Sequence, residues 1–162
     1  MPKFRVLVVE DYEPFRRFIC STLGKRRDLQ IVGELSDGLE AVLQVQELRP
    51  DLILMDVGLP ILNGIEAARR IRALSPNFKI LFVTQESSAE VVQEAFRVGA
   101  LGYVVKTQAG ADLLPAIESV CQSRRFVSEG LAELLPPELA GKQPPRRLSQ
   151  TEASAPARKV GD

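Results

Sequence analysis

Residues 52–60 read LILMDVGLP: four apolar residues run directly into one carboxylate, Asp56, and a Gly and a Pro follow within four positions. A short apolar run bounded by turn residues is typical of a strand buried on both faces, as in a parallel sheet. Asp56 would then lie where a central strand leaves the core, and ligands of open α/β sheets bind just beyond such carboxyl ends. An Asp can also end a strand simply because it favours turns. The role of Asp56 therefore depends on what the other strands deliver to the same edge.

Four further apolar runs alternate with helical patterns on either side of this segment. Strands are expected over residues 4–9, 29–35, 79–84 and 101–106, and helices over residues 13–25, 65–74 and 109–123. Two more helices are expected after capping residues, Ser36 or Asp37 in one case and Ser87 or Ser88 in the other. Five strand–helix units in strict alternation predict an α/β fold, a doubly wound, five-stranded parallel sheet with right-handed crossovers.

Local signals add detail to two of these helices. In the second, the apolar spacing predicts a buried stripe made by Leu39, Val42, Leu43 and Leu48. In the fourth, Gly99 is placed to be the C-terminal cap.

The composition changes after Arg125. Residues 126–135 are expected to add one more amphipathic turn or two, and the stretch beyond them is rich in Pro, Gly, Ser, Ala, Lys and Arg. Such a composition cannot bury enough apolar area to offset the entropy of ordering, so it indicates a linker or a disordered tail. We therefore predict a domain over residues 1–125, followed by a short helical extension and tail over residues 126–162.

The overall composition excludes several classes of site. Lys plus Arg and Asp plus Glu number 21 each, and the chain has no His. Zero net charge gives no overall field for nucleic acid or membrane, and the lack of His excludes Ser-His-Asp and Cys-His nucleophiles and most zinc sites. Cys20 and Cys121 lie in apolar helical patterns and are expected to be free thiols in a reducing compartment. No apolar run approaches the ~20 residues of a membrane span, so we expect a cytoplasmic protein without membrane contact.

Polar residues collect where the predicted strands end. The first strand delivers Glu10 and Asp11, the third Asp56, the fourth Thr84 and the fifth Lys106. In a flavodoxin-like sheet ordered 2-1-3-4-5, an order that comes from known folds and not from these residues, the five side chains converge on one crevice.

Three neighbouring acids need a counter-charge. Two like charges ~4 Å apart repel by roughly 4 kcal/mol at an effective dielectric of 20, so either one carboxyl is protonated or a cation binds. A hard divalent ion with oxygen ligands, Mg²⁺ or Mn²⁺, suits such a site. With the charge of Lys106 and the hydroxyl of Thr84 added, Asp56 becomes a nucleophile for a phosphoryl group, and the product is an aspartyl phosphate.

At this point the chain resembles a two-component response-regulator receiver domain over about residues 3–125. The resemblance rests on five pieces in order, each at a strand end: VVED (8–11), MDVGLP (55–60) with Gly64, VT (83–84) and GYVVK (102–106). The last piece, followed by Thr107 instead of the Pro of many receivers, is most similar to the nitrate-regulator or LuxR type. A cis bond before a non-Pro residue costs ~2.5–4 kcal/mol, so we expect a trans or strained bond between Lys106 and Thr107.

The resemblance implies a role for each matching residue. Asp56 would be the phosphoacceptor, and Asp11 and Asp56 would bind Mg²⁺ directly. Glu10 would bind the ion through water and Gly58 through its backbone carbonyl. The remaining roles are assigned as follows: Lys106 pairs with the phosphoryl oxygens, Thr84 bonds them after phosphorylation, and Tyr103 is the aromatic that swings inward with Thr84.

The implied function is signalling in a phosphorelay, not enzymatic turnover beyond the domain's own phosphorylation and dephosphorylation. A sensor histidine kinase, a phosphotransfer protein or a small donor would supply the phosphoryl group. The face of the fourth helix, fifth strand and fifth helix would then change, for a partner, an output or a second copy in a homodimer. One alternative is a DNA-binding transcriptional regulator cut before its helix-turn-helix domain, since residues 148–153 resemble the opening of such a domain; DNA would be a partner only in that case. An aspartyl-nucleophile phosphohydrolase fits less well, because Gly58 stands where those enzymes place a second acid. A pseudo-receiver that only binds partners is disfavoured by the complete set of acids, threonine and lysine.

Overall fold

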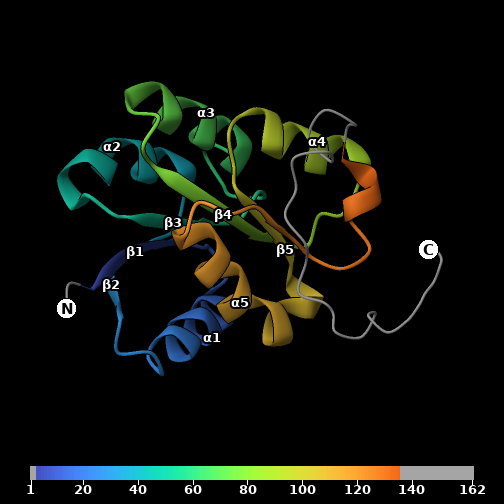
Figure 1. The fold of residues 1–162 in the computed structure, drawn as a ribbon. Coiled ribbons are helices and arrows are strands. Elements are labelled where there is room, and N and C mark those ends of the chain that lie inside the picture. Colours follow the sequence, from blue (N-terminus) through green and yellow to red (C-terminus); the bar gives the residue numbers. More distant parts are fainter. Residues whose placement is uncertain (1–2, 136–162) are drawn as a thin grey trace.

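A six-stranded, all-parallel sheet lies at the centre of residues 3–135, the part of the chain that the computed structural model describes (Figure 1). The strand order is β2-β1-β3-β4-β5-β6. The strands are β1 (Phe4–Val9), β2 (Leu29–Leu35), β3 (Leu52–Met55), β4 (Lys79–Thr84), β5 (Gly102–Val105) and β6 (Phe126–Val127). The predicted flavodoxin-like order of the first five strands is confirmed, and β6 is an addition to it.

Helices cover both faces of this sheet. They are α1 (Glu13–Leu23), α2 (Gly38–Leu48), α3 (Gly64–Leu74), α4 (Ala89–Arg97) and α5 (Ala109–Cys121), with short 3₁₀ helices at Lys106–Gln108 and Ala132–Leu134. Figure 1 shows α2, α3 and α4 on one side of the sheet and α1 and α5 on the other. Within residues 3–135, none of the helices has the length and apolar character needed to span a bilayer.

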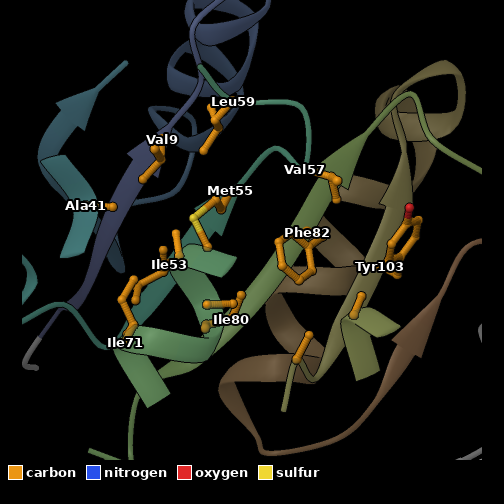
Figure 2. Close-up of a cluster of buried hydrophobic side chains, with 14 of the residues drawn as sticks. Val9, Ala41, Ile53, Met55, Val57, Leu59, Ile71, Ile80, Phe82 and Tyr103 are labelled. Atoms are coloured by element: carbon orange, nitrogen blue, oxygen red, sulfur yellow. The ribbon is translucent and has the colours of Figure 1, made fainter. Parts of the chain in front are cut away.

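The pleat of the strands divides the core into two layers. Alternate residues such as Val9, Ile53, Met55, Phe82 and Tyr103 point toward α2, α3 and α4, and Figure 2 shows this layer. The residues between them point toward α1 and α5: Val6, Val8, Leu52, Leu54, Leu81, Val83 and Val104. Because side chains in a strand alternate in direction and both faces are covered, β1, β3 and β4 must be apolar almost throughout. This is why the sequence shows them as continuous apolar runs.

The helix starts follow the predicted capping chemistry. Asp37 accepts a hydrogen bond from the backbone N–H of Glu40 at 2.8 Å, and Ser88 accepts one from that of Val91 at 3.3 Å. Each of these side chains satisfies one backbone donor that the first helical turn leaves unpaired. At the other end of α4, Gly99 adopts a φ of 108°, which is the left-handed conformation expected of a terminating glycine.

The buried stripe predicted for α2 is partly wrong. Leu39 and Leu43 are exposed, and α2 instead buries Gly38, Ala41 and Val45. The reason is a close approach at the helix start, where a Cβ on Gly38 would lie 2.0 Å from the carbonyl oxygen of Leu62. Because no Cβ fits at position 38, the inward face of α2 carries small residues there, and the larger leucines lie on the outward face. The predicted ends of two other helices are also too late, since α1 stops at Leu23 and α5 at Cys121.

The segment after α5 differs most from the prediction. Residues 126–135 were expected to add a helical turn or two beside a five-stranded sheet, but Phe126–Val127 pairs with Gly102 and Tyr103 as a sixth parallel strand. The 3₁₀ helix Ala132–Leu134 then follows. A two-residue strand is too short to show the alternation by which strands are recognised. The tail predicted beyond residue 135 lies outside the described residues.

Gly64 provides a test of how tightly the third loop is built. It opens α3, and a Cβ there would lie 2.0 Å from the carbonyl oxygen of Asp56. We expect Gly64→Ala to lower the free energy of unfolding by about 1–3 kcal/mol in urea denaturation, because backbone must move to relieve the clash. Gly110→Ala in α5 is the matched control, since its Cβ would meet nothing within 4 Å. Equal stability of the two variants would show that the loop can move to accommodate the Cβ without a cost in stability.

Candidate functional site

Three carboxylates meet at the carboxyl edge of β1 and β3. Glu10 and Asp11 follow β1, and Asp56 follows β3, whose Met55 is in register with Val9 of β1. The backbone N–H of Asp56 donates to the carbonyl oxygen of Val9 at 3.1 Å, which extends the ladder to the site. One oxygen from each of Glu10, Asp11 and Asp56 lies within 4.8 Å of the others. Glu10 is 1% and Asp56 8% exposed, so two of the three charges are largely removed from water.

Lys106, directly after β5, brings a cation into this cluster. Its Nζ lies 3.1 Å from Oδ2 of Asp56 and 3.0 Å from Oε1 of Glu10. The ring of Phe15, on α1, lies 4.6 Å from the same nitrogen, at a distance typical of a cation–π contact. The ammonium is therefore held between two acids and one aromatic ring. Its peptide bond to Thr107 is trans, because residues 3–135 contain no cis bond.

The charges in this cluster shift one another's pKa. Burial raises the pKa of Glu10 above its ordinary value, and the nearby Asp56 adds to the rise. The N–H of Tyr12 and the ammonium of Lys106 partly oppose it. For Lys106, burial lowers the pKa, but Asp56 and Glu10 together outweigh this, so that its pKa is raised. Lys106 is therefore an ammonium ion at neutral pH, and ionisation of Glu10 costs more than it would in water.

The donor set fits a hard divalent cation. Oε1 of Glu10 is buried and accepts no hydrogen bond, although it lies in ion-pair distance of Lys106. When all three carboxyls are ionised, the single ammonium of Lys106 leaves a net negative charge in the cluster, which a further cation would offset. Asp11 is exposed, and its carboxylate lies in the same cluster. An all-oxygen, acid-rich cluster open to solvent on one side is the kind of site that Mg²⁺ or Mn²⁺ occupies while keeping several waters.

Gly58 lies beside this cluster on the loop after β3. Its backbone N–H donates to Oδ1 of Asp56 at 3.3 Å. This bond fixes one carboxylate oxygen while Lys106 holds the other. The expected contribution of the Gly58 carbonyl to a metal stays a prediction.

Thr84 and Tyr103 are connected through one residue that the sequence analysis did not identify. Oγ1 of Thr84 accepts a hydrogen bond from the N–H of Glu86 at 3.3 Å. The hydroxyl of Tyr103 donates to the carbonyl oxygen of the same Glu86 at 2.8 Å. Tyr103 is fully buried, and burial raises the pKa of its hydroxyl, so it stays a neutral donor. Thr84 thus bonds the N–H of Glu86 and Tyr103 bonds its carbonyl oxygen, near the start of the loop between β4 and α4.

The structure brings Glu10, Asp11, Asp56 and Lys106 into one site, whereas Thr84 and Tyr103 form a second group centred on Glu86. Sequence reasoning missed Phe15 and Glu86. Phe15 lies in the helix predicted over residues 13–25, where the spacing of an apolar residue does not distinguish a core residue from one that faces a cation. Glu86 acts through its backbone, so its side-chain type carries no signal.

Comparison with known proteins agrees with this geometry. Residues 6–118 match the family model described as "Response regulator receiver domain". Over 137 residues the chain is 36% identical to the DNA-binding transcriptional activator DevR/DosR of Mycobacterium tuberculosis, covering 85% of this chain and 63% of the relative. It is 34% identical over 131 residues to the response regulator GacA of Pseudomonas viridiflava, covering 81% of this chain and 61% of that protein. The chain thus spans about three-fifths of the length of these curated relatives.

Solved structures give the same result for the fold. A two-component response regulator of the LuxR family from Aurantimonas sp. SI85-9A1 is 34% identical, with a TM-score of 0.77 over 81% of this chain and 94% of that one. The response regulator domain of Thermotoga maritima CheB is also 34% identical, with a TM-score of 0.69 over 74% of this chain and 97% of that one.

The raised pKa of Glu10 predicts how stability depends on pH. A carboxyl group whose pKa is higher in the folded than in the unfolded protein favours folding at low pH. That contribution is lost as the pH rises from about the ordinary value of 4.5 through the folded pKa. In buffer without divalent ions, we expect Glu10→Gln to unfold at a higher urea concentration than the wild type at pH 7. The difference should shrink toward pH 4. Glu47→Gln, at an exposed site on α2, is the matched control. A wild-type and a Glu10→Gln protein with parallel pH profiles would contradict this.

Proposed function

The chain belongs to the response regulator receiver domain family, and from that premise we propose that it accepts a phosphoryl group on Asp56 in a two-component phosphorelay. The observation that carries the proposal is the state of the Asp56 carboxylate. It stands at the carboxyl end of a central strand, 8% exposed, with an ammonium 3.1 Å from one oxygen and a backbone N–H 3.3 Å from the other. These two contacts fix the orientation of the carboxylate, and its exposed part remains accessible to a phosphoryl donor.

In the proposed transfer, an oxygen of Asp56 forms a bond to phosphorus as the bond between phosphorus and the donor group breaks. The donor is a phosphohistidine on a sensor kinase or phosphotransfer protein, or a small acyl phosphate. Negative charge is spread over the phosphoryl oxygens as the group passes between donor and acceptor, so fixed cations placed there lower the barrier. Lys106 supplies one such charge. Mg²⁺ held by Asp11, Asp56 and, through water, Glu10 would supply another, with the Gly58 carbonyl as a further ligand.

The response to phosphorylation would begin at Thr84. Its hydroxyl is engaged with the N–H of Glu86, and turning toward a phosphoryl group on Asp56 requires that bond to break. Glu86 would be released on one side while Tyr103 still holds it on the other. The expected result is a shift of the loop before α4 and of the face formed by α4, β5 and α5. Phosphorylation would act by stabilising one of two arrangements of this segment.

The wider role is proposed from the relatives. We propose that residues 1–125 act as the phosphoacceptor unit and that the chain from residue 126 on connects it to an output, partner or second copy. Proteins related to this chain include a DNA-binding activator, and DNA binding here would need a segment outside the receiver. We place the protein in the cytoplasm, where sensor kinases phosphorylate such domains, and assign it no enzymatic activity beyond its own phosphorylation and dephosphorylation.

Replacement of the acceptor tests the proposal directly. We expect Asp56→Asn to abolish labelling by acetyl phosphate in the presence of Mg²⁺, because an amide is not a nucleophile toward phosphorus. The matched control is Asp51→Asn, at the exposed start of the same strand, where the side chain accepts a hydrogen bond from the N–H of Arg5. That variant should be labelled like the wild type. Full labelling of Asp56→Asn would remove the basis for the acceptor assignment.

The metal site can be tested without phosphorylation. We expect Mg²⁺ to raise the melting temperature of the wild type, since at a concentration ~100 times the Kd a ligand stabilises the folded state by about 2.7 kcal/mol. Asp11→Asn should lose most of that gain, because the exposed carboxylate of the cluster is removed while Lys106 keeps both of its acids. Asp37→Asn, which keeps an N-cap at α2, serves as the control. A gain that persists undiminished in Asp11→Asn would place the ion elsewhere.

A further inference from the structure

Residues 126–135, called the strap below, occupy the edge of β5 and reach the side of α4. Figure 1 shows this segment in orange, leaving the end of α5, passing beside β5 and ending near α4. The strap therefore covers part of the face that the proposed function expects to change on phosphorylation.

The first attachment of the strap is to the backbone of β5. Phe126 and Val127 pair with Gly102 and Tyr103, and the N–H of Ser128 donates to the carbonyl oxygen of Tyr103 at 3.0 Å. The hydroxyl of Ser128 accepts a bond from the N–H of Val105 at 3.1 Å and donates to Oδ2 of Asp112 at 2.8 Å. Ser128 and Asp112 are both buried. These bonds fix the register of the strap along β5.

The second attachment is to α4 and the core beneath it. The side-chain N–H of Gln93, on α4, donates to the carbonyl oxygen of Leu134 at 2.7 Å. Val127, Leu131 and Leu135 are buried in the same core layer as Tyr103 and Phe96. The strap is thus held by two elements at once, and its full set of contacts requires that α4 and β5 keep their present spacing.

Tyr103 links these attachments to Glu86 and, through it, to Thr84. Its hydroxyl is bonded to Glu86, whose N–H is bonded to Thr84, while its carbonyl oxygen is bonded to Ser128 of the strap. The same loop leads directly into α4, which carries Gln93. A change in the position of Glu86 therefore reaches the strap by two routes, through the ring of Tyr103 and through α4.

We propose that the strap senses the state of Asp56: it is docked when Asp56 carries no phosphoryl group and loosened when it does. This inference rests on the proposed function, because it takes Thr84 to turn toward the phosphoryl group and give up its bond to Glu86. The loop and α4 then shift, and the bond from Gln93 to Leu134 is lost while the bonds of Ser128 weaken.

Thermodynamic linkage makes the coupling measurable in both directions. If a phosphoryl analogue loosens the strap, then a mutation that loosens the strap must increase the affinity for the analogue. A strap that is only a structural cover would show neither effect, although it would be buried and bonded in the same way.

The first measurement is hydrogen exchange of the full chain with Mg²⁺, with and without beryllofluoride as phosphoryl analogue. We expect the amides of Ser128, Leu131 and Leu134 to exchange several-fold faster when beryllofluoride is bound. Asp56→Asn should show no such change. Unchanged or slower exchange of these amides in a protein that binds beryllofluoride would overturn the strap proposal and leave the proposed function intact. No binding of beryllofluoride at all would overturn both.

The second measurement uses a variant that weakens the strap from α4. Gln93→Ala removes the bond to Leu134 at a half-buried surface position, and Gln46→Ala, exposed on α2, is the matched control. We expect Gln93→Ala to speed exchange of the strap without ligand and to tighten beryllofluoride binding roughly two- to tenfold, the range expected for one hydrogen bond. Gln46→Ala should leave both unchanged. Equal beryllofluoride affinity in the two variants would show that the strap and the acidic site are not coupled.

Discussion

The arrangement of the site depends on the ion pairs that the ammonium of Lys106 makes with Glu10 and Asp56. Glu10 and Asp56 are largely buried and lie on neighbouring strands, so their charges repel each other in a region that screens them poorly. A cation must be present, and β5 supplies it from two strands away from β3, across a distance of about 10 Å at the usual spacing of a sheet. Only a long side chain at the end of β5 can reach across β4 to that position. Both the strand order and a lysine at this position are therefore needed to place a cation between the two acids.

Two glycines allow the loop after β3 to pack closely beside the site. Gly64 lets the start of α3 approach the carbonyl of Asp56, and Gly38 does the same for α2 against Leu62. Both glycines open a helix on the same side of the sheet. They allow the loop after β3 to fold tightly, so that the N–H of Gly58 comes to Oδ1 of Asp56. The acid is thus held by a side chain from β5 and by the backbone of its own loop.

Much of this could be predicted from the sequence, because the central strands are buried on both faces and read as unbroken apolar runs. The acids and Lys106 stand at the ends of those runs, and their convergence could be predicted once the strand order was taken from known folds. Four features could not be found in this way. The inward face of α2 was misassigned because hydrophobicity favours Leu39 and Leu43, whereas the close approach at Gly38 selects small residues. The strand β6 has two residues and no visible period. Glu86 acts through its peptide group, and Phe15 has the same spacing as a core residue.

The contacts that join Glu86 and α4 to the strap share one property: each ends on a main-chain oxygen. Tyr103 bonds the carbonyl of Glu86, Gln93 bonds that of Leu134, and Ser128 bonds that of Tyr103. The side chains at positions 86 and 134 are therefore not needed for these bonds. The side chain of Glu86 is exposed, so its chemistry can change without loss of these bonds, whereas that of Leu134 also packs against the core. In the proposed mechanism, the surface at position 86 is therefore free to vary while the bonds through which the strap responds are kept.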